Sequence, residues 1–241
     1  ITRPHEVHYL LLRYEVADKE LCASLMGLAA AGRSREWVKR HGSLSPHPVT
    51  DVIQLEQDSS AIRECHPIGI PGLLQTPAYA RTVMASASFV PPDDVEREVA
   101  FRMARKEALS RADPIRLDAV IGEAALRQQM GGPDVMRDQL SHLLDASRAA
   151  NVIVRVLPFA AHSNPGFDGP FAMLDVEPGC FTIVVIDGLA RSVYLEDDAA
   201  VERYNVVFEK LRAMALSETD SRALIEQSLH ELEAPLQEGK R

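Results

Sequence analysis

The stretch Ile115-Arg-Leu-Asp-Ala-Val-Ile121 decides the fold, because it carries the clearest strand signal in the chain. Apolar and polar side chains alternate at first and the run then becomes fully apolar, which is typical of a buried strand. A short helix from Glu123 to Met130 and a second helix that begins at Pro133 separate it from another apolar run, Val152–Leu157. We therefore expect a β-α-α-β unit with a parallel crossover connection.

Further strands are predicted downstream of this unit, at Pro170–Val176, Phe181–Ile186 and Arg191–Leu195. Helices are predicted on both sides: over 49–65 and 93–111 before the unit, and in two segments at the end of the chain. Pro67 ends the first of these helices. The pattern indicates an α+β fold with a central mixed or antiparallel sheet of about four to five strands flanked by helices.

The N-terminal part reads as a separate, small helical unit. Pro4 fits the first turn of a helix, and Asp18 is the expected N-cap of a second one. The stretch Gly42-Ser-Leu-Ser-Pro-His-Pro48 has the composition of a linker. We therefore divide the chain into a helical unit over 1–42 and an α+β domain over 49–235.

Charge is distributed unevenly between these two parts. Residues 1–42 carry seven basic and five acidic groups, a net charge of +2, whereas the other 199 residues carry 19 basic and 30 acidic groups, a net charge of −11. Affinity for nucleic acid comes mainly from neutralising phosphates, so contact with DNA is expected only at or before the N-terminus. No apolar run approaches the roughly 20 residues of a membrane helix, and the start of the chain lacks a signal-peptide pattern. We expect a cytoplasmic protein without a membrane partner.

Motifs for cofactor, metal or catalytic chemistry are missing from the sequence. There is no phosphate-cradling glycine loop, no Gly-x-Ser-x-Gly elbow and no Cys-x-x-Cys pair among the three cysteines. His5-x-x-His8 has the spacing of one helix face but no third ligand. We predict no cofactor, no metal and no catalytic residue.

Five short motifs carry a resemblance to a known family. They are Ile70-Pro-Gly-Leu-Leu-Gln-Thr-Pro-Ala-Tyr-Ala-Arg81, Arg102-x-x-Arg105, Glu123-Ala-Ala-Leu126, Gln139-Leu-x-x-Leu143 and Ala215-Leu-Ser-x-x-x-Ser221. From about Leu55 onward the chain resembles the large actinobacterial domain of unknown function found C-terminal to an Xre/Cro-type helix-turn-helix in WhiJ-like transcriptional regulators. The resemblance implies an effector or partner-binding domain that couples a metabolite or a small acidic partner protein to DNA binding, in a homodimer that recognises paired half-sites.

The same resemblance assigns residues 1–42 to the C-terminal helices of the helix-turn-helix domain. The text Leu12-Arg-Tyr-Glu-Val-Ala-Asp18 resembles the end of its penultimate helix, so the recognition helix is expected upstream of Ile1. The alternative is a helical hairpin that simply packs on the rest. In the later strands the chain departs from the family, because it has Val185-Ile186-Asp187 at the position where family members have a Tyr-x-Glu-like motif.

Eight side chains are candidates for binding a ligand or partner. The polar ends of the 70–81 signature supply three of them, and the arginine motif, the strand-to-helix junction and the loop before Phe171 supply the others. They are Gln75, Tyr79, Arg81, Arg102, Arg105, Glu123, His162 and Phe171. For Glu123, capping of a helix or pairing with Arg102, Arg105 or Arg127 is the structural alternative. Two other functions stay open: a small enzyme that uses Glu123, His162 or Asp187, and a domain that only dimerises.

Overall fold

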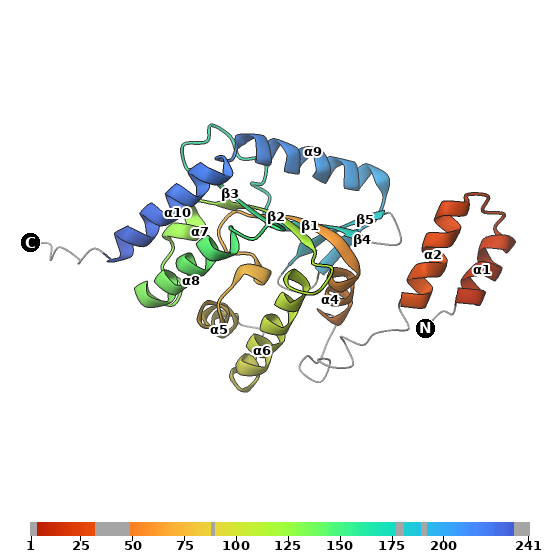
Figure 1. Ribbon diagram of the computed structural model, residues 1–241, viewed down its shortest axis with the longest axis horizontal. Helices are drawn as coiled ribbons and strands as arrows, with labels where there is room; N and C mark the ends of the chain where they lie inside the picture. Colours follow the sequence, from red (N-terminus) through yellow and green to blue (C-terminus); the bar gives the residue numbers. More distant parts are fainter. Residues whose placement is uncertain (1–3, 32–48, 88–89, 177–180, 189–191, 234–241) are drawn as a thin grey trace, which may run out of the picture.

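The computed structural model describes residues 4–31, 49–87, 90–176, 181–188 and 192–233. From residue 49 onward the described residues form one six-stranded sheet with helices on both faces (Figure 1). The strands are β1 (Ser59–His66), β2 (Arg116–Gly122), β3 (Val152–Leu157), β4 (Phe171–Val176), β5 (Phe181–Asp187) and β6 (Ser192–Leu195). The α-helices are α1 (Pro4–Arg13), α2 (Lys19–Ala31), α4 (Val49–Asp58), α5 (Pro77–Ser86), α6 (Val95–Arg105), α7 (Ala124–Arg127), α8 (Pro133–Ala146), α9 (Asp198–Met214) and α10 (Glu218–Glu233). Short 3-10 helices are η2 (Gly72–Leu74), η3 (Pro92–Asp94) and η4 (Lys106–Leu109). None of the helices in these ranges is long and apolar enough to cross a membrane.

The strand order is β3-β2-β1-β4-β5-β6, and the sheet is mixed. The strands β1, β2 and β3 pair in parallel, whereas β4 pairs antiparallel with β1, and β5 and β6 continue antiparallel. The predicted α+β class and the parallel β-α-α-β unit are therefore confirmed. The sheet is slightly larger than the expected four to five strands.

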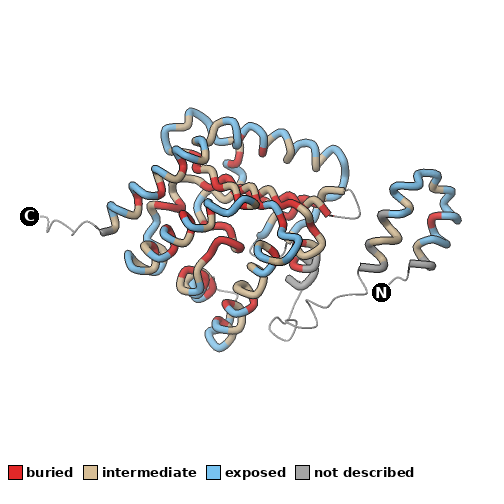
Figure 2. Tube along the Cα trace, viewed as in Figure 1, coloured by how far each residue is buried: buried red, intermediate tan, exposed pale blue. Residues whose placement is uncertain are grey.

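Alternating side chains explain why helices cover both faces. On β2, Leu117, Ala119 and Ile121 point into the larger core, where α5, α8 and α10 pack. Val120 points to the opposite face and joins the core beneath α9, together with Phe208 and Leu211. Figures 1 and 2 show this buried sheet between α9 on one side and the other helices of the domain on the other side. Burying both faces explains why β2 and β3 are almost continuously apolar.

The helix predicted over 49–65 is wrong in its second half. The helix α4 ends at Asp58, and β1 follows at once from Ser59. The Ser59 hydroxyl donates to the carbonyl of Leu55 at 2.6 Å and closes the last helical turn. Beyond it the chain lies between β2 and β4, and pairing on both sides fixes an extended backbone despite the two charged residues in the middle of the strand.

The N-terminal helices α1 and α2 pack against each other as a hairpin (Figure 1). The predicted N-cap is confirmed, because a carboxylate oxygen of Asp18 accepts the backbone N–H groups of Glu20 and Leu21 at 2.9 and 3.0 Å. Among the described residues, the hydrophobic core clusters of the sheet domain begin only at Ile53. The predicted linker, 42–48, lies outside the described residues.

One edge of the sheet is capped by the start of α10. The backbone N–H of Leu216 donates to the carbonyl of Val156 on β3 at 2.9 Å, and the Ser221 hydroxyl accepts the N–H of Val156 at 2.9 Å. Ser221 and Val156 are buried. The Ala215–Ser221 motif therefore attaches the last helix to the edge strand.

Candidate functional site

A cavity of ≈ 400 Å³ lies at the carboxyl end of β1, where the sheet changes from parallel to antiparallel pairing. The chain places β2 and β3 on one side of β1 and then crosses to its other side to form β4. In open α/β sheets a switch of this kind leaves a crevice that commonly holds a ligand. Much of the wall is apolar, from Ile62, Ile68, Ile70, Leu73, Val83, Met130, Phe171, Leu174 and Val185.

The sheet supplies one wall of the cavity through side chains that alternate along the strands. Ile62 and Glu64 of β1 both line it, and the register places Ala172 of β4 opposite Glu64 and Val185 of β5 opposite Ala172. Glu64 therefore stands in a row with one small and one apolar neighbour. Glu64 as a whole residue is only 7 % exposed.

The signature stretch 70–81 forms the facing wall around Gln75, which is buried. Its side-chain amide donates to the carbonyl of Ile70 at 2.8 Å, and its side-chain oxygen accepts a hydrogen bond from Arg102 at 2.9 Å. Its backbone carbonyl accepts from Lys106 at 3.0 Å. Gln75 thus joins the turn to the end of α6. From the sequence, a turn is predicted at Pro71-Gly72 and a short helix near Thr76-Pro77, with Thr76 as its N-cap and Pro77 in its first turn. The predicted turn and helix start are present as well, because the Thr76 hydroxyl accepts the backbone N–H of Tyr79 at the start of α5.

A second buried amide ties this wall to α8. The side chain of Gln139 donates to the carbonyl of Leu74 at 2.8 Å and accepts the backbone N–H of Thr76 at 2.7 Å. Nearby, Lys106 lies 2.8 Å from Nε2 of His142. Burial lowers the pKa of Lys106 and of His142, and for His142 the lysine charge lowers it further. The signature is therefore held from two helices at once.

The arginine motif places two cations against the cavity with different partners. Arg105 makes a two-point ion pair with the buried carboxylate of Glu56 on α4, through Nε at 2.9 Å and through Nη2. Burial opposes the charge of Arg105, but the charge and hydrogen bond of Glu56 outweigh it and hold the pKa above its usual value. Arg102 has no carboxylate partner among the described residues and donates only to Gln75. Burial, with the charge of Arg105, lowers the pKa of Arg102 to about 10.

The cavity lining also includes two acidic residues from the sheet, Glu64 and Asp187. Oε2 of Glu64 lies 3.0 Å from Nε2 of His66, whereas Oε1 has no hydrogen-bond partner among the described residues. Asp187, at the end of β5, is exposed and accepts a hydrogen bond from Ser192 at 2.6 Å. The cavity therefore holds an arginine and a carboxylate oxygen that the described residues leave incompletely paired.

Five of the eight candidate residues meet at this cavity: Gln75, Tyr79, Arg102, Arg105 and Phe171. The ring of Phe171 also packs edge to face on Tyr204 of α9, with the ring centroids 4.9 Å apart. Of the other charged lining residues, Glu56, Glu64 and His66 were not predicted as site residues, and Asp187 was named only for the enzyme alternative. For Glu64 one signal was present, a carboxylate among the apolar residues of Ala61-Ile62-Arg63-Glu64-Cys65.

The remaining three candidates lie elsewhere. Arg81 is exposed and pairs with Glu96 at 2.5 Å. Glu123 does not cap α7 with its side chain; it pairs with Arg127 at 3.3 Å and accepts the backbone N–H of Phe159 at 2.9 Å. The pairing alternative for Glu123 is therefore seen with the last of the three arginines. His162 is exposed in the connection between β3 and β4.

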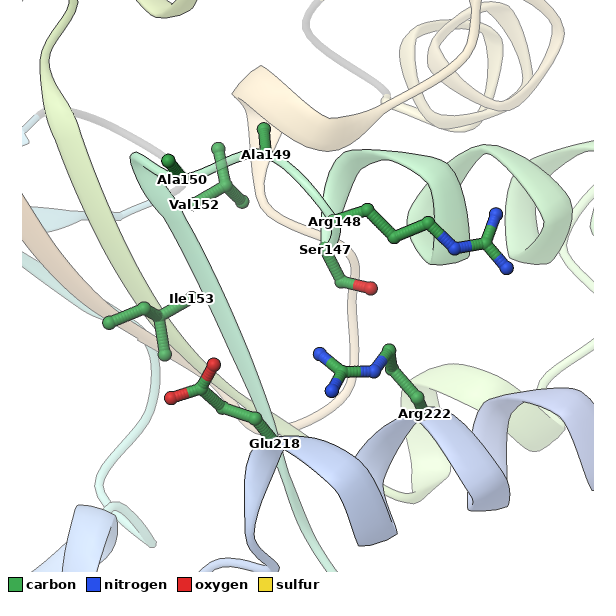
Figure 3. A pocket seen from close by; sticks show the side chains of 8 residues that line it. All are labelled: Ser147, Arg148, Ala149, Ala150, Val152, Ile153, Glu218 and Arg222. Atoms are coloured by element: carbon green, nitrogen blue, oxygen red, sulfur yellow. The ribbon is translucent and has the colours of Figure 1, made fainter.

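A second hollow, of ≈ 520 Å³, lies between the end of α8, β3 and the start of α10 (Figure 3). In Figure 3 the side chains of Ser147, Glu218 and Arg222 border its open centre. Ser147 donates to a backbone carbonyl and Glu218 accepts from Arg155, so these groups already have partners within the fold. We take the cavity at β1 as the candidate site. Within the described ranges no group of three or more histidine, cysteine or acidic residues is placed to hold a metal ion.

The geometry defines an α+β domain with a ligand-sized cavity at the switch point of a mixed sheet. A family model described as a domain of unknown function, DUF5753, matches residues 49–227. The chain belongs to that family, and the match covers the sheet and all of the residues that line the cavity. No curated protein and no solved structure matches the chain.

Proposed function

We propose that this chain is the effector domain of a DNA-binding transcriptional regulator, and that a small molecule bound in the β1 cavity changes how the regulator binds DNA. The observation that carries the proposal is the cavity itself, where much of the wall is apolar and the described residues give Arg102 no carboxylate within ion-pair distance. Pockets of roughly 300–1,000 Å³ with a few convergent polar groups are the usual form of small-molecule sites. The regulatory role rests on the sequence motifs, which resemble those of WhiJ-like regulators.

The contacts around Gln75 connect the cavity to helices outside it, so a bound ligand would affect the positions of those helices. A ligand that engages Arg102 of α6 competes with or reinforces its bond to Gln75, and Lys106, at the start of η4, also donates to Gln75. The adjacent Thr76 and Leu74 are held by Gln139 of α8. A ligand that binds one arrangement of these helices more tightly than another shifts the regulator toward the first arrangement. The ratio of the two affinities sets the upper limit of this shift.

The proposal assigns DNA contact to the N-terminal side of the chain. The hairpin of α1 and α2 exposes Tyr9, Leu12 and Tyr14, which are 64 %, 66 % and 76 % exposed. Apolar surface of this kind is suited to packing against a further helical element of a DNA-binding domain. The net charge of +2 in residues 1–42 favours DNA over the acidic remainder, and a homodimer would match paired half-sites.

A binding experiment with and without ligand tests the proposal. The complete natural polypeptide would be used to select DNA sequences, and its affinity for the selected site would be measured by fluorescence anisotropy with each compound that raises the melting temperature of the protein. We expect at least one compound to change DNA affinity by about 5- to 150-fold, the usual range of allosteric coupling.

Two variants make the result specific to the cavity. Arg102→Met alters the cavity, and Arg148→Met alters the hollow of Figure 3 while leaving the cavity intact. The first should abolish the response to the compound and the second should preserve it. A full-length protein that binds no specific DNA, or one whose DNA affinity no cavity ligand changes, would contradict the proposal.

A further inference from the structure

Within the part of the chain that the structure describes, two groups of opposite charge in the cavity lack a full set of partners. The Arg102 guanidinium has five N–H donors, and the described structure uses one of them, in the bond to Gln75. Glu64 has one oxygen bound to His66 and another with no partner among the described residues. Both side chains line the same cavity, Glu64 from the sheet and Arg102 from α6. Their incomplete pairing is what a ligand would correct.

Glu64 is buried and Arg102 is half-buried, and a charge withdrawn from water without a full set of partners is unfavourable. Its retention in a folded domain calls for a physical reason. The second arginine does not supply one, because Arg105 pairs with Glu56 through Nε and Nη2 and makes no ion pair with Glu64 among the described residues. The unpaired oxygen of Glu64 is itself covered, but a carboxylate turns easily about its terminal bond and can present either oxygen to a donor that enters. An entering molecule can therefore satisfy both groups.

The balance of charge limits what that molecule is. The cavity has two arginines, Arg102 and Arg105, against the carboxylates of Glu56, Glu64 and Asp187, with His66 in addition. A strongly anionic ligand would be attracted by Arg102 but repelled by the three carboxylates. A cationic ligand would be attracted by Glu64 but repelled by the two arginines. A molecule that carries one charge of each sign avoids both penalties.

The interior also requires an apolar portion. Between the polar groups the wall is formed by Ile70, Leu73, Val83 and Met130, and the volume is near the lower end of the range for small-molecule sites. Ile68, which is 68 % exposed, lines the cavity and also reaches solvent, so the Pro67–Gly69 turn lies at its mouth. The space is suited to a compact side chain and not to an extended polymer.

Resting on the effector function proposed above, we propose that the ligand is a small zwitterion of the amino-acid type with an apolar side chain. Its carboxylate pairs with the free N–H groups of Arg102, in the two-point geometry that guanidinium and carboxylate favour. Its ammonium group donates to Glu64. The side chain fills the apolar part of the cavity.

Calorimetric titration of the chain with matched compounds tests the ligand class without any mutation. The parent compounds are L-leucine, L-isoleucine, L-valine, L-methionine, L-phenylalanine and L-tryptophan. Each is compared with the amino alcohol that lacks the carboxylate and with the carboxylic acid that lacks the ammonium. We expect at least one parent to bind about 10- to 100-fold more tightly than both of its analogues, the value of one charge-assisted hydrogen bond. If no parent binds at millimolar concentration, or if the analogues bind as tightly, the zwitterion assignment is wrong.

Two variants then assign each end of the ligand. Glu64→Gln should weaken the parent at least tenfold and leave the carboxylic acid analogue unchanged, whereas Arg102→Met should weaken the parent and leave the amino alcohol unchanged. A variant that fails to fold would lose both ligands, so this crossed pattern separates recognition from misfolding. Arg148→Met, outside the cavity, should change neither. Equal losses for both ligands in a folded variant would contradict the assignment.

The DNA measurement distinguishes failure of this inference from failure of the proposed function. If a compound of another class binds the cavity and changes DNA affinity, the effector function stands and the zwitterion is excluded. If a zwitterion binds with the crossed pattern but DNA affinity does not change, the ligand class stands and the effector function fails.

Discussion

Replacing Gln75 by leucine should destabilise the domain strongly, although leucine has a similar size. The substitution leaves the carbonyl of Ile70 without its 2.8 Å donor and removes the acceptor of Arg102 at 2.9 Å. An orphaned buried acceptor costs about 1–3 kcal/mol, and a lost hydrogen bond to a charged group costs about 1.5–3 kcal/mol. The expected loss in the free energy of unfolding is therefore about 2.5–6 kcal/mol, a large part of the roughly 5–15 kcal/mol of a typical domain.

Urea unfolding of purified Gln75→Leu, followed by circular dichroism, measures this loss. The matched control is Gln128→Leu, because Gln128 also lines the cavity but is exposed and makes no side-chain hydrogen bond in the described structure. The control should change the free energy of unfolding by no more than about 0.5 kcal/mol. A loss below about 1 kcal/mol for Gln75→Leu, with an unchanged denaturant slope, would refute the view that Gln75 holds the signature wall together.

Three more outcomes are expected from the fold. Glu56→Gln should lower the free energy of unfolding by about 3–5 kcal/mol, because Arg105 would keep a buried charge without its counter-ion. In a double-mutant cycle, adding Arg105→Met should restore part of that free energy. His142→Gln should make the stability of the domain less sensitive to acid, because burial lowers the pKa of this imidazole in the folded state. Its contribution to stability is present above the ordinary pKa of 6.5 and is lost as the pH falls through the lower pKa of the folded state. Urea unfolding above and below pH 6.5 will measure the difference. Gly122→Ala should lower the melting temperature sharply, because the new Cβ would meet a backbone oxygen at 2.1 Å, whereas Gly69→Ala, with open space around it, should not.

Much of the sheet was predictable because its signals are local. The runs that became β2, β3, β4 and β5 are apolar or alternating, lie between turn residues, and match the structure within one or two residues. Their partners did not have to be known to recognise them. The Thr76-Pro77 helix start was equally local, because an N-cap and a proline in the first turn act within four residues.

The missed strand shows where local signals fail. Two charged residues, Arg63 and Glu64, occupy the middle of β1, so no apolar alternation marks it. Each charge has a use that depends on distant segments: Arg63 pairs with Asp175 at 2.9 Å on one face, and Glu64 lines the cavity on the other. A central strand that breaks the usual pattern at a site is consistent with function overriding local preference.

The site was only partly predictable for the same reason. The family motifs pointed to Gln75, Arg102 and Arg105, and all three line the cavity. Their arrangement depends on contacts across long stretches of chain, such as the ion pair from Arg105 to Glu56. These two residues are 49 positions apart, and helix or strand periodicity in the sequence cannot indicate a contact at that separation. Sequence motifs therefore identified several walls of the cavity but not the carboxylates that complete it.

The attachment of α10 to β3 has a consequence for assembly. Because Leu216 and Ser221 occupy the hydrogen-bonding groups of Val156 at that edge, another strand cannot add there without displacing the last helix. Growth of the sheet into a neighbouring molecule is thereby directed to the opposite end, where β6 is short and carries the exposed side chains Val193 and Tyr194. The two ends of the sheet therefore differ: α10 covers the β3 edge, whereas the β6 edge is the one that a neighbouring strand would have to extend.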